Sequence, residues 1–322
     1  ILAFLVLFSC VVFFIRRNII KIKRFWSKEM TTWPKTDANL ILIFEIFLMT
    51  AFMVMNCSDQ ILQERGVDHY IIAGSFPISS FFVPLFDSFS STNLIIIERF
   101  TWWFHILGIL AFLNYVLISK HLHIFFAFPS TYYANIEKLG KFDNLKSVTN
   151  EVKLMLDPNA DPFAVPQNQD QKPVSLFGAR DATDLNWVQL LNAYSCTECG
   201  RCSSVCPANQ TGKELSPRKI MMDTRDRIEE IGRLKENNTN YLLGNYISKE
   251  ELWACTTCNA CTDACPINLD PLSIIVDLRR YLVMEESAAP TELNNMFSNV
   301  ENNGAPWQFP AADRLNWIEE NK

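Results

Sequence analysis

The sequence lacks a surplus of positive charge, because its 29 lysines and arginines face 35 aspartates and glutamates. No basic stripe is available to neutralise phosphates, which argues against nucleic acid as the partner. Strand-like alternation of apolar and polar residues is scarce. No phosphate-binding loop, general base or activated nucleophile stands out. These absences favour a mainly helical protein that does not itself transform a bound metabolite.

The two parts of the chain differ in composition. Residues 1–118 hold nine basic and eight acidic residues and are dominated by Phe, Ile, Leu and Val. Residues 119–322 hold twenty basic and twenty-seven acidic residues. The high apolar content of residues 1–118 argues against an ordinary soluble protein. We therefore expect a transmembrane helical domain over residues 1–125, followed by an acidic soluble part.

Three apolar runs are candidates for membrane spans. Residues 1–15 lack the basic start and the small-residue cleavage site of a signal peptide, which predicts a transmembrane helix truncated at its N-terminus. Residues 38–57 and 94–118 each supply about the twenty residues that a bilayer requires. The run at 76–89 is short and interrupted by proline. It predicts a re-entrant or interfacial segment, with a tilted short helix as the alternative.

Charge in the loops predicts the orientation of these spans. Cytoplasmic loops are enriched in lysine and arginine. The loop between the first two spans contains Arg16, Arg17, Lys21, Lys23, Arg24 and Lys28. The segment after the second span is mainly acidic and suits the outer face. The third span then returns at Lys120, so we expect the rest of the chain on the cytoplasmic side of the inner membrane.

Two ionisable side chains lie near the middle of predicted spans, Glu45 in the second and His105 in the third. Leaving such a group unpaired inside a membrane is costly, so both are functional candidates. A structural hydrogen bond to a neighbouring helix is the alternative.

The soluble part begins with a connector over residues 126–185, which are rich in Pro, Asp and Asn. A periodic apolar pattern resumes at residue 186. Helices are expected there and at 217–236, 249–254 and 271–286. We divide the remainder into a helical domain over 186–290 and a C-terminal extension over 291–322.

Eight of the ten cysteines form two runs of identical spacing. Both runs read C-x2-C-x2-C-x3-C-P, at residues 196–207 and 255–266, which is the spacing of two-cluster bacterial ferredoxins. The first three thiolates of a run bind one [4Fe–4S] cluster, and the fourth binds the other. The first cluster is thus assigned to Cys196, Cys199, Cys202 and Cys265. The second is assigned to Cys255, Cys258, Cys261 and Cys206.

Other uses of these cysteines fit less well. Structural zinc sites usually take their four ligands in pairs, and disulfides are unexpected on the cytoplasmic side. The forty-eight residues between Cys206 and Cys255 exceed what a small βαββαβ ferredoxin requires and have helical character. The predicted fold class is therefore all-α, with a transmembrane helical domain followed by an α-helical ferredoxin domain that holds two [4Fe–4S] clusters.

On these motifs the chain resembles membrane-bound iron–sulfur oxidoreductases related to the heterodisulfide reductase iron–sulfur subunit. Similar domains occur in the C subunit of anaerobic glycerol-3-phosphate dehydrogenase. The resemblance is carried by the two cysteine runs, by RRYLVMEES (279–287) and by MFSNVENNGAPWQFPAADRLNW (296–317). Residues 102–129 resemble the last helix of cytochrome b-type subunits similar to the nitrate reductase γ subunit. Family members often continue into CCG domains, and no such motif occurs here. The resemblance therefore implies a shortened chain or a separate CCG-domain or flavoprotein subunit.

The cysteine runs and the resemblance predict an electron-transfer subunit of a membrane redox complex rather than a stand-alone enzyme. Electrons would pass between a cytoplasmic redox partner and the membrane quinone pool through the two clusters. One alternative is a scaffold or assembly subunit with structural clusters. Another is part of a heterodisulfide-type reductase acting on a soluble substrate, which requires the CCG module.

A site for menaquinone or ubiquinone is predicted at the cytoplasmic end of the third span. There Lys120, His121 and His123 precede an aromatic run formed by Phe125, Phe126 and Phe128. A quinone ring could stack on the aromatic side chains while a histidine exchanges a proton. Simple anchoring of the helix end by basic residues is the alternative.

Haem b is the remaining candidate cofactor. His105 and His123 are eighteen residues apart on what the sequence predicts as one continuous helix. They are too far apart to share one iron but suit two stacked haems. The spans at 1–15 and 38–57 contain no opposing histidine, and Glu45 is a poor substitute for imidazole. We therefore expect at least one haem to be lost. In that case Glu45 and His105 could form a buried proton-carrying pair.

Overall fold

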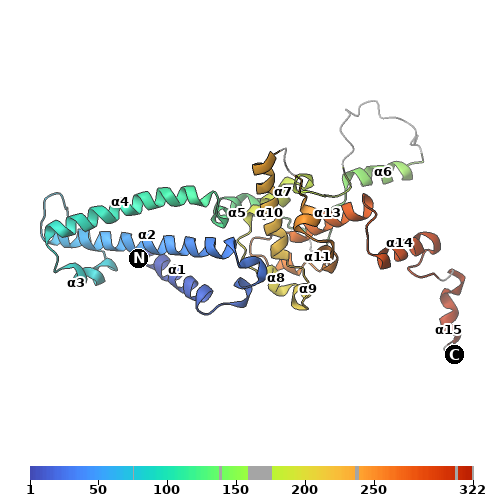
Figure 1. Cartoon of the computed structure of the whole chain (residues 1–322), viewed down its shortest axis with the longest axis horizontal. Coiled ribbons are helices and arrows are strands. Elements are labelled where there is room, and N and C mark those ends of the chain that lie inside the picture. Colours follow the sequence, from blue (N-terminus) through green and yellow to red (C-terminus); the bar gives the residue numbers. More distant parts are fainter. Residues whose placement is uncertain (75, 138–139, 159–175, 236–238, 309–310, 321–322) are drawn as a thin grey trace, which may run out of the picture.

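The computed structural model describes residues 1–74, 76–137, 140–158, 176–235, 239–308 and 311–320. Across these residues the chain is helical, and the extended pairing consists of one isolated bridge between Leu243 and Ile247. The helical fold class is thus confirmed for the described part of the chain. Long helices form a hairpin, and the shorter helices that carry the cysteine runs gather at its open end (Figure 1).

Two long helices, α2 (Trp33–Glu64) and α4 (Ser91–Val116), pack side by side in the hairpin. Both are long and apolar enough to cross a bilayer. They approach closely because Gly108 has no side chain, and a Cβ there would overlap the side chain of Leu48. Small residues commonly allow such contact between membrane helices. One turn earlier, His105 Nδ1 is hydrogen-bonded to the Leu48 carbonyl oxygen at 3.0 Å.

The other elements of the first part are shorter. α1 (Leu2–Asn18) packs on α2, and their connection contains the one-turn helices η1 (Lys23–Phe25) and η2 (Lys28–Met30). At the opposite end of the hairpin lie η3 (Ser79–Phe82) and α3 (Val83–Phe86), four residues each. Neither is long enough to span a bilayer. Both pack against α2, so the described structure has no separate span within residues 76–89.

The third predicted span does not continue to His123. α4 ends at Val116, η4 (Lys120–Leu122) follows, and α5 (His123–Tyr132) begins as a separate helix. Ser119 caps the break, since its hydroxyl accepts the His121 amide and donates to Asp37. The prediction of one continuous helix through His105 and His123 is therefore wrong. The two-haem arrangement assumed that both histidines lie on one straight helix, and this assumption does not hold.

Four helices of the cysteine-bearing domain lie close to their predicted positions. They are α7 (Trp187–Ser195), α10 (Pro217–Leu234), α11 (Lys249–Ala254) and α13 (Pro271–Met284). Short helices follow within or directly after the cysteine runs, namely α8 (Arg201–Val205), α9 (Pro207–Gln210) and α12 (Ala260–Asp263). A single apolar core that includes Ile220, Leu252 and Ile274 holds these elements together.

The connector and the C-terminal extension contain a few further elements. The connector contains α6 (Lys146–Leu156) and η5 (Ala182–Asp184), and the extension contains α14 (Thr291–Asn303), η8 (Ala311–Leu315) and α15 (Asn316–Glu320). The short η7 (Leu242–Tyr246) belongs to the cysteine-bearing domain. The boundary predicted at residue 125 falls inside α5, which packs on α7. Residues 159–175 of the predicted connector lie outside the described residues. α14 and α15 extend away from the cysteine-bearing domain (Figure 1).

Candidate metal centre

The two cysteine runs adopt the same loop geometry. Residues with positive φ occupy equivalent positions in both: Glu198, Gly200, Thr257 and Asn259, at 58°, 73°, 56° and 59°. In each loop, the amide of the first of these residues donates to the Sγ of the leading cysteine at 3.4 Å. Amide donation to cysteine sulfur is a recurring feature around iron–sulfur clusters and tunes their potential. The backbone is therefore shaped to curl around a group held by the thiols.

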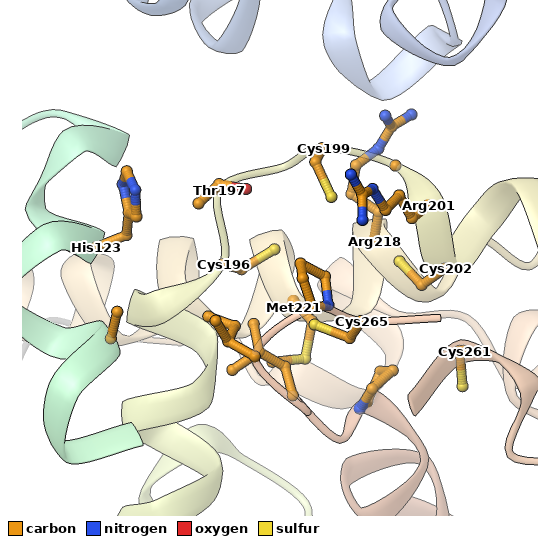
Figure 2. A pocket seen from close by; sticks show the side chains of 16 residues that line it. His123, Cys196, Thr197, Cys199, Arg201, Cys202, Arg218, Met221, Cys261 and Cys265 are labelled. Atoms are coloured by element: carbon orange, nitrogen blue, oxygen red, sulfur yellow. The ribbon is translucent and has the colours of Figure 1, made fainter. Parts of the chain in front are cut away.

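A cavity of about 300 Å³ is bordered by the first loop (Figure 2). The cysteines that line it are Cys196, Cys199, Cys202, Cys261 and Cys265. Three of them come from the first run, and Cys265 comes from the end of the second. The structure thus brings together the four thiols that the crossed arrangement assigns to the first cluster. Cys261, which is assigned to the second cluster, also borders this cavity.

The remaining thiols gather around Cys255. Burial raises the pKa of the Cys255 thiol, and Cys206 and Cys258 lie close enough to raise it further. Cys261 lies within electrostatic range of Cys255 as well. Cys206 and Cys261 are buried, whereas Cys258 is exposed. Cys206 of the first run therefore lies near Cys255 and Cys258 of the second run, whereas Cys261 lies near Cys202 as well as near Cys255.

The chemistry of these thiols fits a cluster better than a single ion. Within the described residues, no three His, Cys, Asp or Glu side chains converge closely enough to hold one metal ion. The ligands of a [4Fe–4S] cluster bind different irons, so they are spaced more widely. All ten cysteines are free. Burial raises the pKa of Cys196 to about 12 and that of Cys202 to about 11, so cationic iron is needed to stabilise the thiolates.

The first cysteine loop is tied to the end of the hairpin. Glu198, between Cys196 and Cys199, is buried and forms ion pairs with Lys120 of η4 and, at 3.0 Å, with Arg225 of α10. Lys120 also donates to the Pro34 carbonyl at 2.7 Å. Lys120 is therefore committed to a buried contact with the cysteine loop. The place of Glu198 between two cysteines is the one feature of the sequence that points to this residue.

The two predicted histidines lie between the hairpin and the first cavity. His123 and Ala127 of α5 line the cavity, where Figure 2 shows His123 beside Thr197. The His121 ring lies 5.6 Å from the His123 ring and 5.4 Å from the Phe112 ring of α4. Burial, followed by the nearby His123, lowers the pKa of His121, which keeps it neutral at pH 7. The two imidazoles thus form a chain of contacts from α4 to the cavity.

In the aromatic run beside these histidines, one ring packs against the protein and two are exposed. Phe126 packs on Tyr194 of α7 at a ring separation of 5.8 Å. Phe125 and Phe128 are 59% and 85% exposed. The exposed rings are available to a membrane or to an apolar ligand.

Glu45 and His105 lie elsewhere, within the hairpin. Glu45 is within electrostatic range of His105, whose ring packs on Phe52 at 5.3 Å. The axial rise of α4 separates His105 by about 10 Å from Phe112, which packs on His121, and His123 lines the first cavity. Neither of those histidines shares an iron with His105. The hydrogen bond between His105 and the Leu48 carbonyl is a structural contact to a neighbouring helix, which is the alternative role predicted for His105.

Comparison with known proteins agrees with this site. The family model described as "4Fe-4S dicluster domain" matches residues 192–269. The chain is similar to a protein named as an iron–sulfur-binding oxidoreductase and to one named as a membrane-anchored ferredoxin. Matches to heterodisulfide reductase subunits C and D confirm the resemblance drawn from the cysteine runs. No solved structure matches the chain.

Three relatives illustrate the extent of the similarity. The probable iron-sulfur-binding oxidoreductase FadF of Bacillus subtilis is 29% identical over 92% of this chain and 43% of its own length. The EtfAB:quinone oxidoreductase of Syntrophomonas wolfei is 27% identical over 92% and 42%. A probable membrane-anchored ferredoxin of Chromohalobacter salexigens is 32% identical over 45% and 24%. The chain thus spans less than half the length of these relatives.

Proposed function

We propose that this chain is the electron-transfer part of a quinone-linked membrane oxidoreductase, passing electrons between a cytoplasmic redox partner and the membrane quinone pool. The observation that carries the proposal is the convergence of Cys265 with the first run of cysteines on one cavity. The dicluster family model supports the iron–sulfur chemistry. The name of the Syntrophomonas relative supports quinone as one of the two redox partners.

Two [4Fe–4S] clusters are held by the crossed sets of cysteines. Cys196, Cys199, Cys202 and Cys265 bind the first, and Cys255, Cys258, Cys261 and Cys206 bind the second. When bound, each cluster accepts and releases one electron at a time. The chain contributes the thiolates and the amide donors of Glu198 and Thr257, and it buries three of the thiols, those of Cys196, Cys206 and Cys261.

The first cluster is the one nearer the membrane. His123 of α5 lines its cavity, and Lys120 of η4 pairs with Glu198 in its loop. The second cluster faces solvent through the exposed Cys258. Electrons therefore move between the membrane and the first cluster, and between the second cluster and the soluble partner.

The cysteine-bearing domain lies on the cytoplasmic side of the inner membrane. The basic loop between α1 and α2 is at the same end of the hairpin as this domain, since Arg218 of α10 donates to the Arg24 carbonyl at 2.6 Å. Basic loops of membrane proteins are retained in the cytoplasm. The charge pattern and this contact therefore support the same orientation.

Quinone binds beside His121 and His123, between the end of α4 and the first cavity. Phe112 packs on His121, and the exposed rings of Phe125 and Phe128 supply an apolar surface. A neutral imidazole can exchange the proton that accompanies quinone reduction. Because His123 lines the first cavity, a quinone bound here would lie next to the first cluster.

Quinone-dependent reoxidation tests this proposal. The purified full chain in detergent is reduced with stoichiometric dithionite and mixed with a water-soluble menaquinone analogue. We expect His121→Ala and His123→Ala to slow reoxidation by quinone roughly 100-fold, while ferricyanide still oxidises the clusters normally. His69→Ala, in the loop between α2 and α4, is the matched control and should retain the wild-type rate. Wild-type rates in both test variants would show that quinone binds elsewhere.

A further inference from the structure

Arg218, near the start of α10, is a buried cation in the wall of the first cavity. Its side chain is 2% exposed and borders the cavity together with Cys199 and Cys202 (Figure 2). Gly200 allows this contact, because a Cβ there would overlap the guanidinium. Gly200 also has a positive φ that disfavours any other residue. The guanidinium therefore packs directly on the first cysteine loop.

The guanidinium reaches from the cavity to the basic loop between α1 and α2. Nη2 donates to Ser27 and, at 2.7 Å, to a carboxylate oxygen of Glu29. Nη1 donates to the Arg24 carbonyl at 2.6 Å. Nε, by contrast, is buried and has no hydrogen-bond partner among the described residues. An unsatisfied buried donor is costly, and in this position it points to an acceptor that is not part of the polypeptide.

The second half of the domain has no arginine at the position that corresponds to Arg218. α10 starts with Ser216, Pro217 and Arg218, and α13 starts in the same way with Asp270, Pro271 and Leu272. The second cysteine loop has a cation of its own nearby, Arg279. Its Nε and Nη2 donate to carbonyl oxygens of Leu252 and Cys255, at 3.0 Å and 2.6 Å. Nε and Nη2 of Arg279 are thus satisfied by backbone, whereas Nε of Arg218 is buried without a hydrogen-bond partner among the described residues.

We propose that Arg218 raises the reduction potential of the first cluster, with Nε donating to one of its sulfur atoms, and that Glu29 moderates this effect. The inference rests on the proposed ligand set of that cluster. Reduction adds one electron, and a fixed positive charge nearby stabilises the added negative charge. A hydrogen bond to cluster sulfur acts in the same direction. Glu29 neutralises part of the charge, so the loop next to the membrane helices influences the cluster through Arg218.

A redox titration of the purified full chain, followed by electron paramagnetic resonance, tests this inference. Arg218→Met should lower the midpoint potential of the first cluster and leave that of the second unchanged. Glu29→Gln should raise the first midpoint, because the guanidinium loses its counter-charge. Arg218→Lys keeps the charge and should shift the midpoint less than Arg218→Met. Arg233→Met changes an exposed arginine in the last turn of the same helix and should move neither midpoint.

Two results would contradict the inference: unchanged midpoints in Arg218→Met with both clusters retained, or an equal fall of both midpoints. If Arg218→Met fails to assemble the first cluster, Glu29→Gln tests the inference alone. A midpoint potential of the first cluster that does not rise in this variant then contradicts it. Failure of the two-cluster proposal itself would look different. The wild-type chain would then lack two four-iron clusters from the outset.

Discussion

At the residue scale, the two cysteine loops differ most in the residue that precedes their second cysteine. Glu198 and Thr257 both use their amides to donate to cysteine sulfur. Glu198 adds a buried carboxylate that joins Lys120 and Arg225. The Thr257 side chain instead bonds the neighbouring Thr256 carbonyl. The first loop is therefore fixed to the hairpin of α2 and α4 through Glu198, and the second loop has no counterpart of this contact at Thr257.

The crossed fourth ligand is tested by Cys206→Ser. Cys206 lies in the first run but is assigned to the cluster held by Cys255, Cys258 and Cys261. We expect the variant to alter or abolish the paramagnetic resonance signal of the second cluster and to leave the first intact. Cys265→Ser is the reciprocal variant and should affect the first cluster. Loss of the first signal alone in Cys206→Ser would overturn the assignment.

A pH-dependent contribution to stability comes from Asp181. Burial opposes its ionisation, but hydrogen bonds from Arg227, at 2.7 Å and 2.6 Å, and from two amides outweigh burial and lower its pKa. A lowered folded-state pKa stabilises the fold above the unfolded value of about 3.9, and this stabilisation is lost as the pH falls further. Asp181→Asn should therefore reduce the free energy of unfolding by roughly 3 kcal/mol at pH 7.

Thermal unfolding in detergent at pH 7 and at lower pH measures this effect. The deficit of Asp181→Asn should shrink as the pH approaches and passes below about 4. Glu292→Gln, which changes an exposed carboxylate at the start of α14, is the control and should unfold like wild type. A deficit that stays constant down to pH 3 would show that the ion pair is not its origin.

At the element scale, the junction of α2, α4 and η4 sets the position of the candidate quinone site. Asp37 of α2 is 1% exposed and accepts hydrogen bonds from the Tyr115 hydroxyl, the Ser119 hydroxyl and the Lys120 amide. These contacts hold the chain where α4 stops. Because α4 ends here, α5 begins as a separate helix. Its first residue, His123, lines the first cavity.

Asp37→Ala tests the importance of this junction. The change leaves three donors without their acceptor, at about 1–3 kcal/mol for each donor that stays buried. We expect a larger loss of thermal stability in detergent than in Ser119→Ala, which removes only one of the three hydrogen bonds to Asp37 together with the one from the His121 amide. Thr36→Ala, at the exposed neighbouring position, should behave like wild type. Equal melting temperatures for Asp37→Ala and wild type would contradict the role given to this carboxylate.

The helices of the cysteine-bearing domain could be predicted because their signals are local. α11 begins with a capping box between Ser248 and Glu251, and α13 begins with proline at its first position. The end of α4 could not be predicted in this way. Residues 117–123 are compatible with a helix, and the partner that stops it, Asp37, is more than eighty residues away. The two ligand sets read from the cysteine spacing stay predictions, and the spacing carries no information about the distant partners of Glu198 and Arg218.

At the scale of the whole molecule, the elements follow one another along a single long axis (Figure 1). The hairpin lies at one end, the cysteine-bearing domain lies next to it, and α14 and α15 extend beyond. The first cavity is the one bordered by residues of α5, next to the hairpin, and Cys258 of the second set is exposed. This layout is the physical basis for the proposed order, in which quinone exchanges electrons with the first cluster and the soluble partner with the second.

The central claim is that this chain holds two redox-active [4Fe–4S] clusters. Iron and sulfide analysis of the purified full chain, combined with a redox titration followed by electron paramagnetic resonance, tests it most directly. We predict about eight irons per chain, four for each cluster, and two one-electron reduction steps. A chain that carries zinc in place of iron, or clusters that never change oxidation state across the titration, would contradict the claim.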